Sequence, residues 1–146
     1  MADYDLEDDF PNLKGSPWEK TSDPATNYNC IAWSLYDTRQ WWQKPAFPLR
    51  GYYWPPGISR DDTIDSWIKV LEIHGYRLCE STDLELGFEK VAIYVKDNEP
   101  QHVARQLTSG SWTSKLGPNE DIAHPPHGLE GKVYGTIEKV LKRERR

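Results

Sequence analysis

A chain of 146 residues is the size of one domain, and its net charge of −5 argues against a nucleic-acid binder, whose affinity depends on Lys and Arg neutralising phosphates. The acidic N-terminus lacks the apolar segment of a signal peptide, and no stretch approaches the roughly 18 apolar residues of a membrane span. With only two cysteines, the chain is predicted to be a single domain over 1–146, in the cytoplasm, without a disulfide, a nucleic-acid partner or a membrane partner.

Residues 1–26 are predicted to form an irregular N-terminal arm, because acidic residues dominate its first nine positions and prolines interrupt the rest. We expect three apolar side chains to hold this arm against the body of the protein: Phe10, Leu13 and Trp18.

The pattern becomes helical at 27–36, the stretch NYNCIAWSLY. Ile31 and Leu35 are spaced to share a buried face, and Asn27 or Asn29 can cap the helix, since an Asn side chain accepts a bond from a free helix N–H. The predicted catalytic-type α+β core spans residues 27–141 and begins with this helix, which bears Cys30.

A loop over 39–58 follows, rich in proline and aromatic residues. Its rings either cover the core or line a substrate cleft. The candidate cleft residues, together with one from the preceding helix, are Trp33, Trp41, Trp42 and Trp54.

A second helix is predicted over 60–74, with Ser59 as its N-cap and Gly75 just beyond its end. Its apolar stripe is Ile64, Trp67, Ile68 and Leu71.

From Lys90 the period of apolar residues changes to two, which is typical of strands. The sequence predicts strands at 90–95, 101–107, 111–116 and 132–140, joined by short turns except for a loop over 117–131. The predicted fold class is therefore α+β, with N-terminal helices packed on an antiparallel sheet of about four strands.

Cys30 is the candidate nucleophile, because a helix N-terminus lowers the pKa of a thiol. A cysteine nucleophile also needs a base, usually His, and a polar group that orients it. Of the four histidines, His102 lies on a predicted strand, where its position is rigidly set. His74 ends a helix, and the other two lie in a proline-bounded loop.

The third member is predicted from the register of the hairpin. If Ser109-Gly110 is a two-residue turn, Asp121 shares the face of His102, and a slip of one residue reverses this. Asn119 and Glu120 are the alternatives for this role. The oxyanion would bind the backbone N–H of Cys30 with support from Asn27 or Asn29, although simple helix capping is the favoured role of both asparagines.

Other interpretations remain open at this point. Cys30 is consistent with a buried structural thiol, and Cys79, in an apolar context, favours that role. A zinc site of Cys30, His124 and His127 has no familiar ligand spacing, so the sequence predicts no metal and no other cofactor.

The order of these residues resembles the papain-like superfamily in its broad sense, including the NlpC/P60 and transglutaminase-like cysteine hydrolases. Within it the chain looks like a little-characterised family of small bacterial proteins. The matching pieces are NCIAWSLYDTRQWW, YWPPG, GFEKVAIY, HVARQL and WTSKLGPNEDIAH. The resemblance implies a papain-like fold, with Cys30 as nucleophile and His102 as base.

Two functions follow. The first is a cysteine hydrolase or acyl transferase of the peptidase, amidase or deamidase type, acting on a peptide, another amide or another protein through Cys30, His102 and Asp121. The second is a non-catalytic binding module, such as an inhibitor or immunity-type protein, that uses the aromatic loop 41–54.

Overall fold

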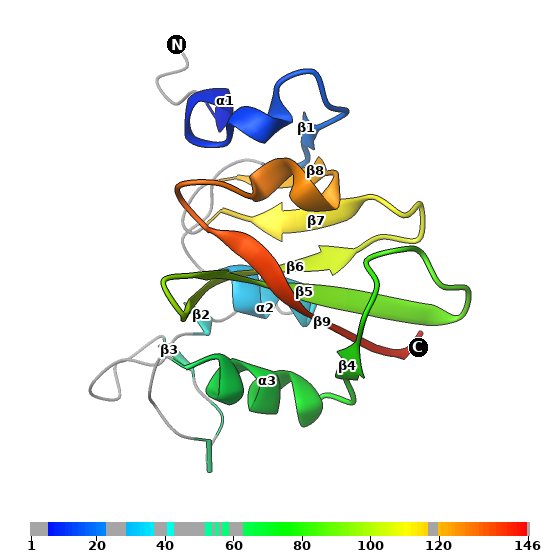
Figure 1. Ribbon diagram of the computed structural model, residues 1–146. Helices are drawn as coiled ribbons and strands as arrows, with labels where there is room; N and C mark the ends of the chain where they lie inside the picture. Colours follow the sequence, from blue (N-terminus) through cyan, green and yellow to red (C-terminus); the bar gives the residue numbers. More distant parts are fainter. Residues whose placement is uncertain are drawn as a thin grey trace.

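The chain folds around one antiparallel sheet, seen in a computed structural model that describes residues 6–22, 29–36, 41–42, 52–53, 55, 57–58, 63–116 and 120–145. Within these residues the sheet has seven strands in the order β1-β8-β7-β6-β5-β9-β4 (Figure 1). The strands are β1 (Glu19–Lys20), β4 (Arg77–Cys79), β5 (Phe88–Lys96), β6 (Glu99–Gln106), β7 (Trp112–Lys115), β8 (Asp121–His124) and β9 (Thr136–Glu144). A separate parallel pair joins β2 (Trp41–Trp42) and β3 (Tyr52–Tyr53).

The helices of the described residues are few and short. They are α1 (Leu6–Asp9), α2 (Cys30–Ser34) and α3 (Ile64–Glu72), with 3₁₀ turns η1 (Pro11–Leu13) and η2 (Pro126–Leu129). None of the helices in these described ranges is long and apolar enough to span a membrane.

The fold class predicted from the sequence is wrong. The sequence predicts N-terminal helices on a sheet of about four strands, whereas the described residues form mainly a seven-stranded sheet. Strands β1 and β8 have two and four residues, too few for alternation to be visible in the sequence. Strand β8 also lies within 117–131, which the sequence favours as a loop.

Two hairpins set the register of the central strands. β5 and β6 are joined by Asp97 and Asn98, whose φ angles of 53° and 65° are those of a tight hairpin turn. β6 and β7 are joined by a longer turn, because Leu107 donates its N–H to Ser111 and residues 108–110 lie between them. Gly110 closes that turn at φ 94°, which a glycine adopts without strain.

The sheet buries side chains on both faces. The face covered by α2 and α3, called the helix face below, is built from Val91, Ile93, Val95, Val103 and Leu141. The other, called the arm face, lies under α1, η1 and η2 and is built from Ala92, Tyr94, Ala104, Trp112, Ile122 and Val140. Since side chains alternate along a strand, neighbours in sequence on β6, β7 and β8 point to opposite faces.

The N-terminal segment is held against the arm face as the sequence predicts. Phe10 and Leu13 are buried, and Trp18 packs on the same cluster. The indole N–H of Trp18 also donates to Glu7 at 2.9 Å. The described part of this arm is not irregular throughout, since it contains α1, η1 and β1.

Helix α3 confirms the predicted apolar stripe, because all four of its residues pack in the core of the helix face. Ser59, the predicted N-cap, lies outside the described residues. The helix begins after Thr63, whose hydroxyl accepts the Ser66 N–H at 3.2 Å. Gly75 follows its end with φ 94°, as the sequence predicts.

Candidate functional site

Cys30 is the first residue of α2, which packs on β6 and β7 over the helix face. Asn29 caps this helix by accepting the Ala32 N–H at 3.2 Å. Beyond its other end Tyr36 adopts a φ of 64°, in the left-handed region, and donates its hydroxyl to Glu89 at 2.5 Å. Both ends of a very short helix are therefore fixed by side chains.

Trp33 anchors α2 to the sheet. Its indole N–H donates to Thr113 on β7 at 3.0 Å, and the Arg105 guanidinium lies 5.2 Å from its ring centroid. Arg105 also lies 4.0 Å from the ring of Tyr36. The predicted role of Trp33 as a cleft wall has no support from these contacts, which are those of a packing residue.

The Cys30 thiol is subject to opposing influences. The residue keeps part of its surface exposed, but burial raises the pKa of the thiol from 9.0 to about 11. Backbone hydrogen bonds from Val103, Ile31 and Cys30 itself, and the charge of Lys115, act in the opposite direction. The resting thiol is protonated at neutral pH, and the groups that favour a thiolate are already placed around it.

Lys115 and Asp121 lie on the same face as Cys30. They are directly opposed on β7 and β8, and their exposed fractions are 0% and 2%. Burial lowers the pKa of Lys115, while the charges of Asp121, Cys30 and Glu120 act against that shift. A buried lysine with an aspartate opposed to it therefore shares the face of the sheet on which Cys30 lies.

His102 lies on the opposite face of the sheet. Its strand neighbour Val103 belongs to the helix face with Cys30, whereas His102 pairs across the strands with Tyr94 of the arm face. Its ring stacks on Tyr134, with centroids 4.2 Å apart and planes 3° from parallel. The structure therefore does not bring the predicted nucleophile and the predicted base together.

A chain of hydrogen bonds occupies His102 on the arm face. Its Nε2 lies 2.8 Å from Ser114 Oγ, which lies 2.7 Å from His124 Nε2. His124 Nδ1 must donate to the Pro125 carbonyl, 2.6 Å away, because a carbonyl oxygen only accepts. Burial lowers the pKa of His124 to about 4, so its Nε2 is unprotonated and accepts from Ser114. Ser114 in turn accepts from His102.

The tautomer of His102 follows from that order. The Nε2 of His102 carries the proton and donates it in the hydrogen bond to Ser114. Its buried Nδ1 has no hydrogen-bond partner among the described residues. Burial, and to a smaller degree the nearby His124, lower the pKa of His102 well below 6.5. This histidine is a neutral core residue with no free route to a thiol.

The predicted sharing of a face by His102 and Asp121 is wrong. The turn before β7 has three residues, so Arg105 pairs with Thr113 and the register differs by one from a two-residue turn. Asp121 consequently faces the helix side with Cys30. Its backbone N–H donates to Ser22 at 3.0 Å, which ties it to the N-terminal arm.

The remaining predicted site residues divide into two groups. Asn27, Asn119 and Trp54 lie outside the described residues, as do the side chains of Trp41 and Trp42, and so does most of the aromatic loop. Glu120 is half-buried just before β8 and affects the charge state of Lys115. Asn29 makes the capping bond already described.

Lys115 is the residue that sequence reasoning missed. The signal that could have found it is alternation, because Thr113 and Lys115 share a face of β7 and Trp112 and Ser114 share the other. A lysine in a strand whose four residues are all buried requires a partner, and the opposed Asp121 provides one.

The zinc set considered from the sequence does not assemble. Cys30 is on the helix face, His124 is buried in the hydrogen-bond chain of the arm face, and His127 is largely exposed. No cluster of three or more His, Cys, Asp or Glu suited to a metal ion occurs in the part of the chain that the structure describes.

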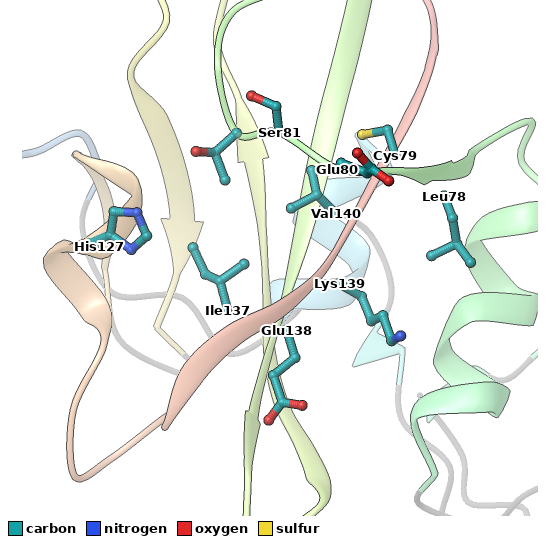
Figure 2. A pocket seen from close by; sticks show the side chains of 10 residues that line it. Leu78, Cys79, Glu80, Ser81, His127, Ile137, Glu138, Lys139 and Val140 are labelled. Carbon is teal, nitrogen blue, oxygen red and sulfur yellow. The ribbon is translucent and has the colours of Figure 1, made fainter.

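A cleft of about 640 Å³ lies elsewhere, beside β4, β9 and η2 (Figure 2). His127 and Cys79 stand on opposite sides of it, and the His127 Nδ1 lies 2.7 Å from Glu130. Apolar side chains of Ile137 and Val140 contribute to the arm-face core beside it. This cleft contains none of the predicted catalytic residues. It is lined by Leu78, Cys79, Glu80, Ser81, Thr82, His127, Ile137, Glu138, Lys139 and Val140.

Comparison with known proteins places the chain in a protein family. Residues 19–142 match the family described as Domain of unknown function (DUF7689). No curated protein and no solved structure matches the chain. The matched segment includes α2, α3 and every strand of the sheet except the last two residues of β9. Since the match covers most of its length, the chain belongs to this family of domains of unknown function.

Proposed function

We propose that this protein is a cysteine-dependent acyl-transfer enzyme that hydrolyses or transfers at an amide bond, with Cys30 as the nucleophile. One observation carries the proposal. Cys30 begins α2 on the face of the sheet that also carries the buried, directly opposed Lys115 and Asp121, and neighbouring backbone groups act to lower the pKa of its thiol. The amide substrate is what the papain-like resemblance implies.

The surroundings of the sulfur suit a nucleophile that is activated only during reaction. Burial keeps the thiol protonated at rest, which protects it from oxidation and from unselective alkylation. The backbone N–H groups of Cys30, Ile31 and Val103 then stabilise the thiolate, or the oxyanion of an acyl group attached to it. Both cysteines are free, so we expect a reducing compartment such as the cytoplasm.

The test is acylation with p-nitrophenyl acetate, an activated acyl donor that needs no matched leaving group. The wild-type protein is expected to release p-nitrophenolate in a burst, to carry an acetyl group on Cys30 in peptide mass spectrometry, and then to turn over. Cys30→Ser is expected to lose the burst and the turnover.

Cys79→Ser is the matched control, because Cys79 is the other free and partly exposed cysteine. It should retain the burst. Acetylation of Cys79 in place of Cys30, or turnover that survives in Cys30→Ser, would show that Cys30 is not the nucleophile.

A further inference from the structure

We infer that Lys115 is the proton partner of Cys30, accepting the thiol proton when the sulfur attacks and returning it to the leaving group. This inference rests on the proposed nucleophilic role of Cys30. The geometry of the sheet carries it, because Lys115 is buried on the face of β7 that packs under the helix bearing Cys30.

The placement of Lys115 follows from the three-residue turn and from strand alternation. Thr113, two residues earlier on β7, is bonded to Trp33 of α2, so this face of β7 lies directly under the helix that bears Cys30. Lys115 is completely buried there, which is rare for a lysine unless its charge is compensated or used. Asp121, opposed to it on β8, provides the compensation.

Three further charged groups lie around this pair among the described residues. Asp121 lies on β8, Glu120 just before it, and Arg105 on β6 at the other end of α2. Arg105 is stacked on Trp33 and Tyr36. An arginine stays protonated, so it is excluded as a proton acceptor.

Burial makes the amine form of Lys115 accessible. It lowers the pKa of this side chain, whereas burial raises the pKa of Cys30, so the proton affinities of the two groups approach one another. Proton transfer between them is then easier than between a lysine and a cysteine in water. His102 cannot replace Lys115, because it lies on the opposite face of the sheet and its Nε2 donates to Ser114.

The proposed step balances as follows. The Lys115 amine takes the proton from the Cys30 thiol, the sulfur bonds to the acyl carbon, and the carbon–nitrogen bond of the amide breaks. The Lys115 ammonium gives its proton to the departing amine. A water molecule then attacks the thioester, passing one proton to Lys115, and the acid leaves as Lys115 returns that proton to the Cys30 thiolate.

Lys115→Arg is the decisive variant, since arginine keeps the positive charge but does not accept a proton. We expect the rate of Cys30 acetylation by p-nitrophenyl acetate to fall by about 10²-fold or more, the usual contribution of a positioned base. Lys90→Arg is the matched control. Lys90 is also buried on a strand, but it bonds the Ser81 and Asp83 carbonyls on the arm face, so its replacement should leave the rate unchanged.

Asp121→Asn is a second, independent test, which remains informative if the Lys115→Arg variant does not fold. Asp121 raises the pKa of Lys115, so its neutralisation should make the amine form available at lower pH and move the rise of the acetylation rate with pH to lower pH. Wild-type rates and an unmoved profile in Lys115→Arg and Asp121→Asn, with acetylation still lost in Cys30→Ser, would overturn the role of Lys115 and leave the proposed function intact. Loss of the function itself would be seen in Cys30→Ser, as described above.

Discussion

Burial affects the pKa of the Cys30 thiol more than the position of Cys30 at a helix N-terminus does. The N-terminus of α2 favours a thiolate, but a helix of five residues has little dipole, and burial raises the pKa of the thiol to about 11. Sequence reasoning predicted the helix in which Cys30 lies. It could not foresee the burial, which depends on β6 passing beneath it.

The first prediction concerns the ionisation of Cys30. In the Cys79→Ser background, the rate of alkylation of the folded protein by iodoacetamide should reach half its maximum near pH 11, because only the thiolate reacts. The same protein in denaturant should reach half its maximum near pH 8.5. A plateau below pH 8 in the folded protein would contradict the buried placement of the sulfur.

The second prediction concerns the stability of the protein at acidic pH. Burial holds the pKa of His124 near 4, whereas an unfolded histidine titrates near pH 6.5, so below pH 6.5 the unfolded chain binds a proton that the folded chain does not. Between pH 7 and 4, His124 alone should lower the free energy of unfolding by roughly 3 kcal/mol, and His102, whose pKa burial also lowers, adds to the loss. Urea unfolding at several pH values measures this loss.

His124→Gln tests the assignment, because its amide can accept from Ser114 and donate to the Pro125 carbonyl without titrating. Between pH 7 and 4 it should lose roughly 3 kcal/mol less than the wild type, because the contribution of His102 remains. The largely exposed His127→Gln is the control and should behave like the wild type. Equal losses in His124→Gln and the wild type would exclude the buried histidine as the cause.

At the scale of elements, the turn before β7 decides which side chains meet. A single extra residue, made possible by Gly110 at φ 94°, puts His102 on the arm face and Asp121 on the helix face. The sequence predicts the strands on either side but does not distinguish a two-residue from a three-residue turn at Ser109-Gly110. The helices α2 and α3 could be predicted because their apolar stripes are local, whereas β1 is formed by pairing with the distant strand β8.

The third prediction separates capping from catalysis at Asn29. Asn29→Ser preserves an N-cap acceptor, so it should retain both stability and Cys30 acetylation. Asn29→Ala removes the cap and should lower the free energy of unfolding by about 1 kcal/mol. If Asn29→Ser keeps its stability but loses acetylation, the side chain has a catalytic role beyond the cap.

At the scale of the whole molecule, a buried ion pair connects the sheet with helices α2 and α3. Glu89 and Arg143 are opposed on β5 and β9, with Arg143 Nε 2.5 Å from the carboxylate. Arg143 also donates to the His74 carbonyl at the end of α3, and Glu89 accepts from Tyr36 beyond α2. The position of α2 on the sheet, and hence of Cys30, depends on this connection.

The fourth prediction tests that connection. Arg143→Met leaves Glu89 buried with its main charge partner removed, and should lower the free energy of unfolding by about 3–5 kcal/mol in chemical denaturation. Adding Glu89→Gln to Arg143→Met should recover part of the loss. Lys142→Met, which removes a more exposed partner of Glu85, is the control and should cost much less. Equal losses in the two single variants would mean that the buried pair has no special structural role.

The most direct test of the central claim compares Cys30 acetylation in His102→Gln and Lys115→Arg. The glutamine can still donate to Ser114, so the arm face should remain intact. We predict that His102→Gln is acetylated at close to the wild-type rate and that Lys115→Arg is not, because Lys115 shares a face of the sheet with Cys30 and His102 does not. Loss of acetylation in His102→Gln, with the wild-type rate retained in Lys115→Arg, would contradict the account.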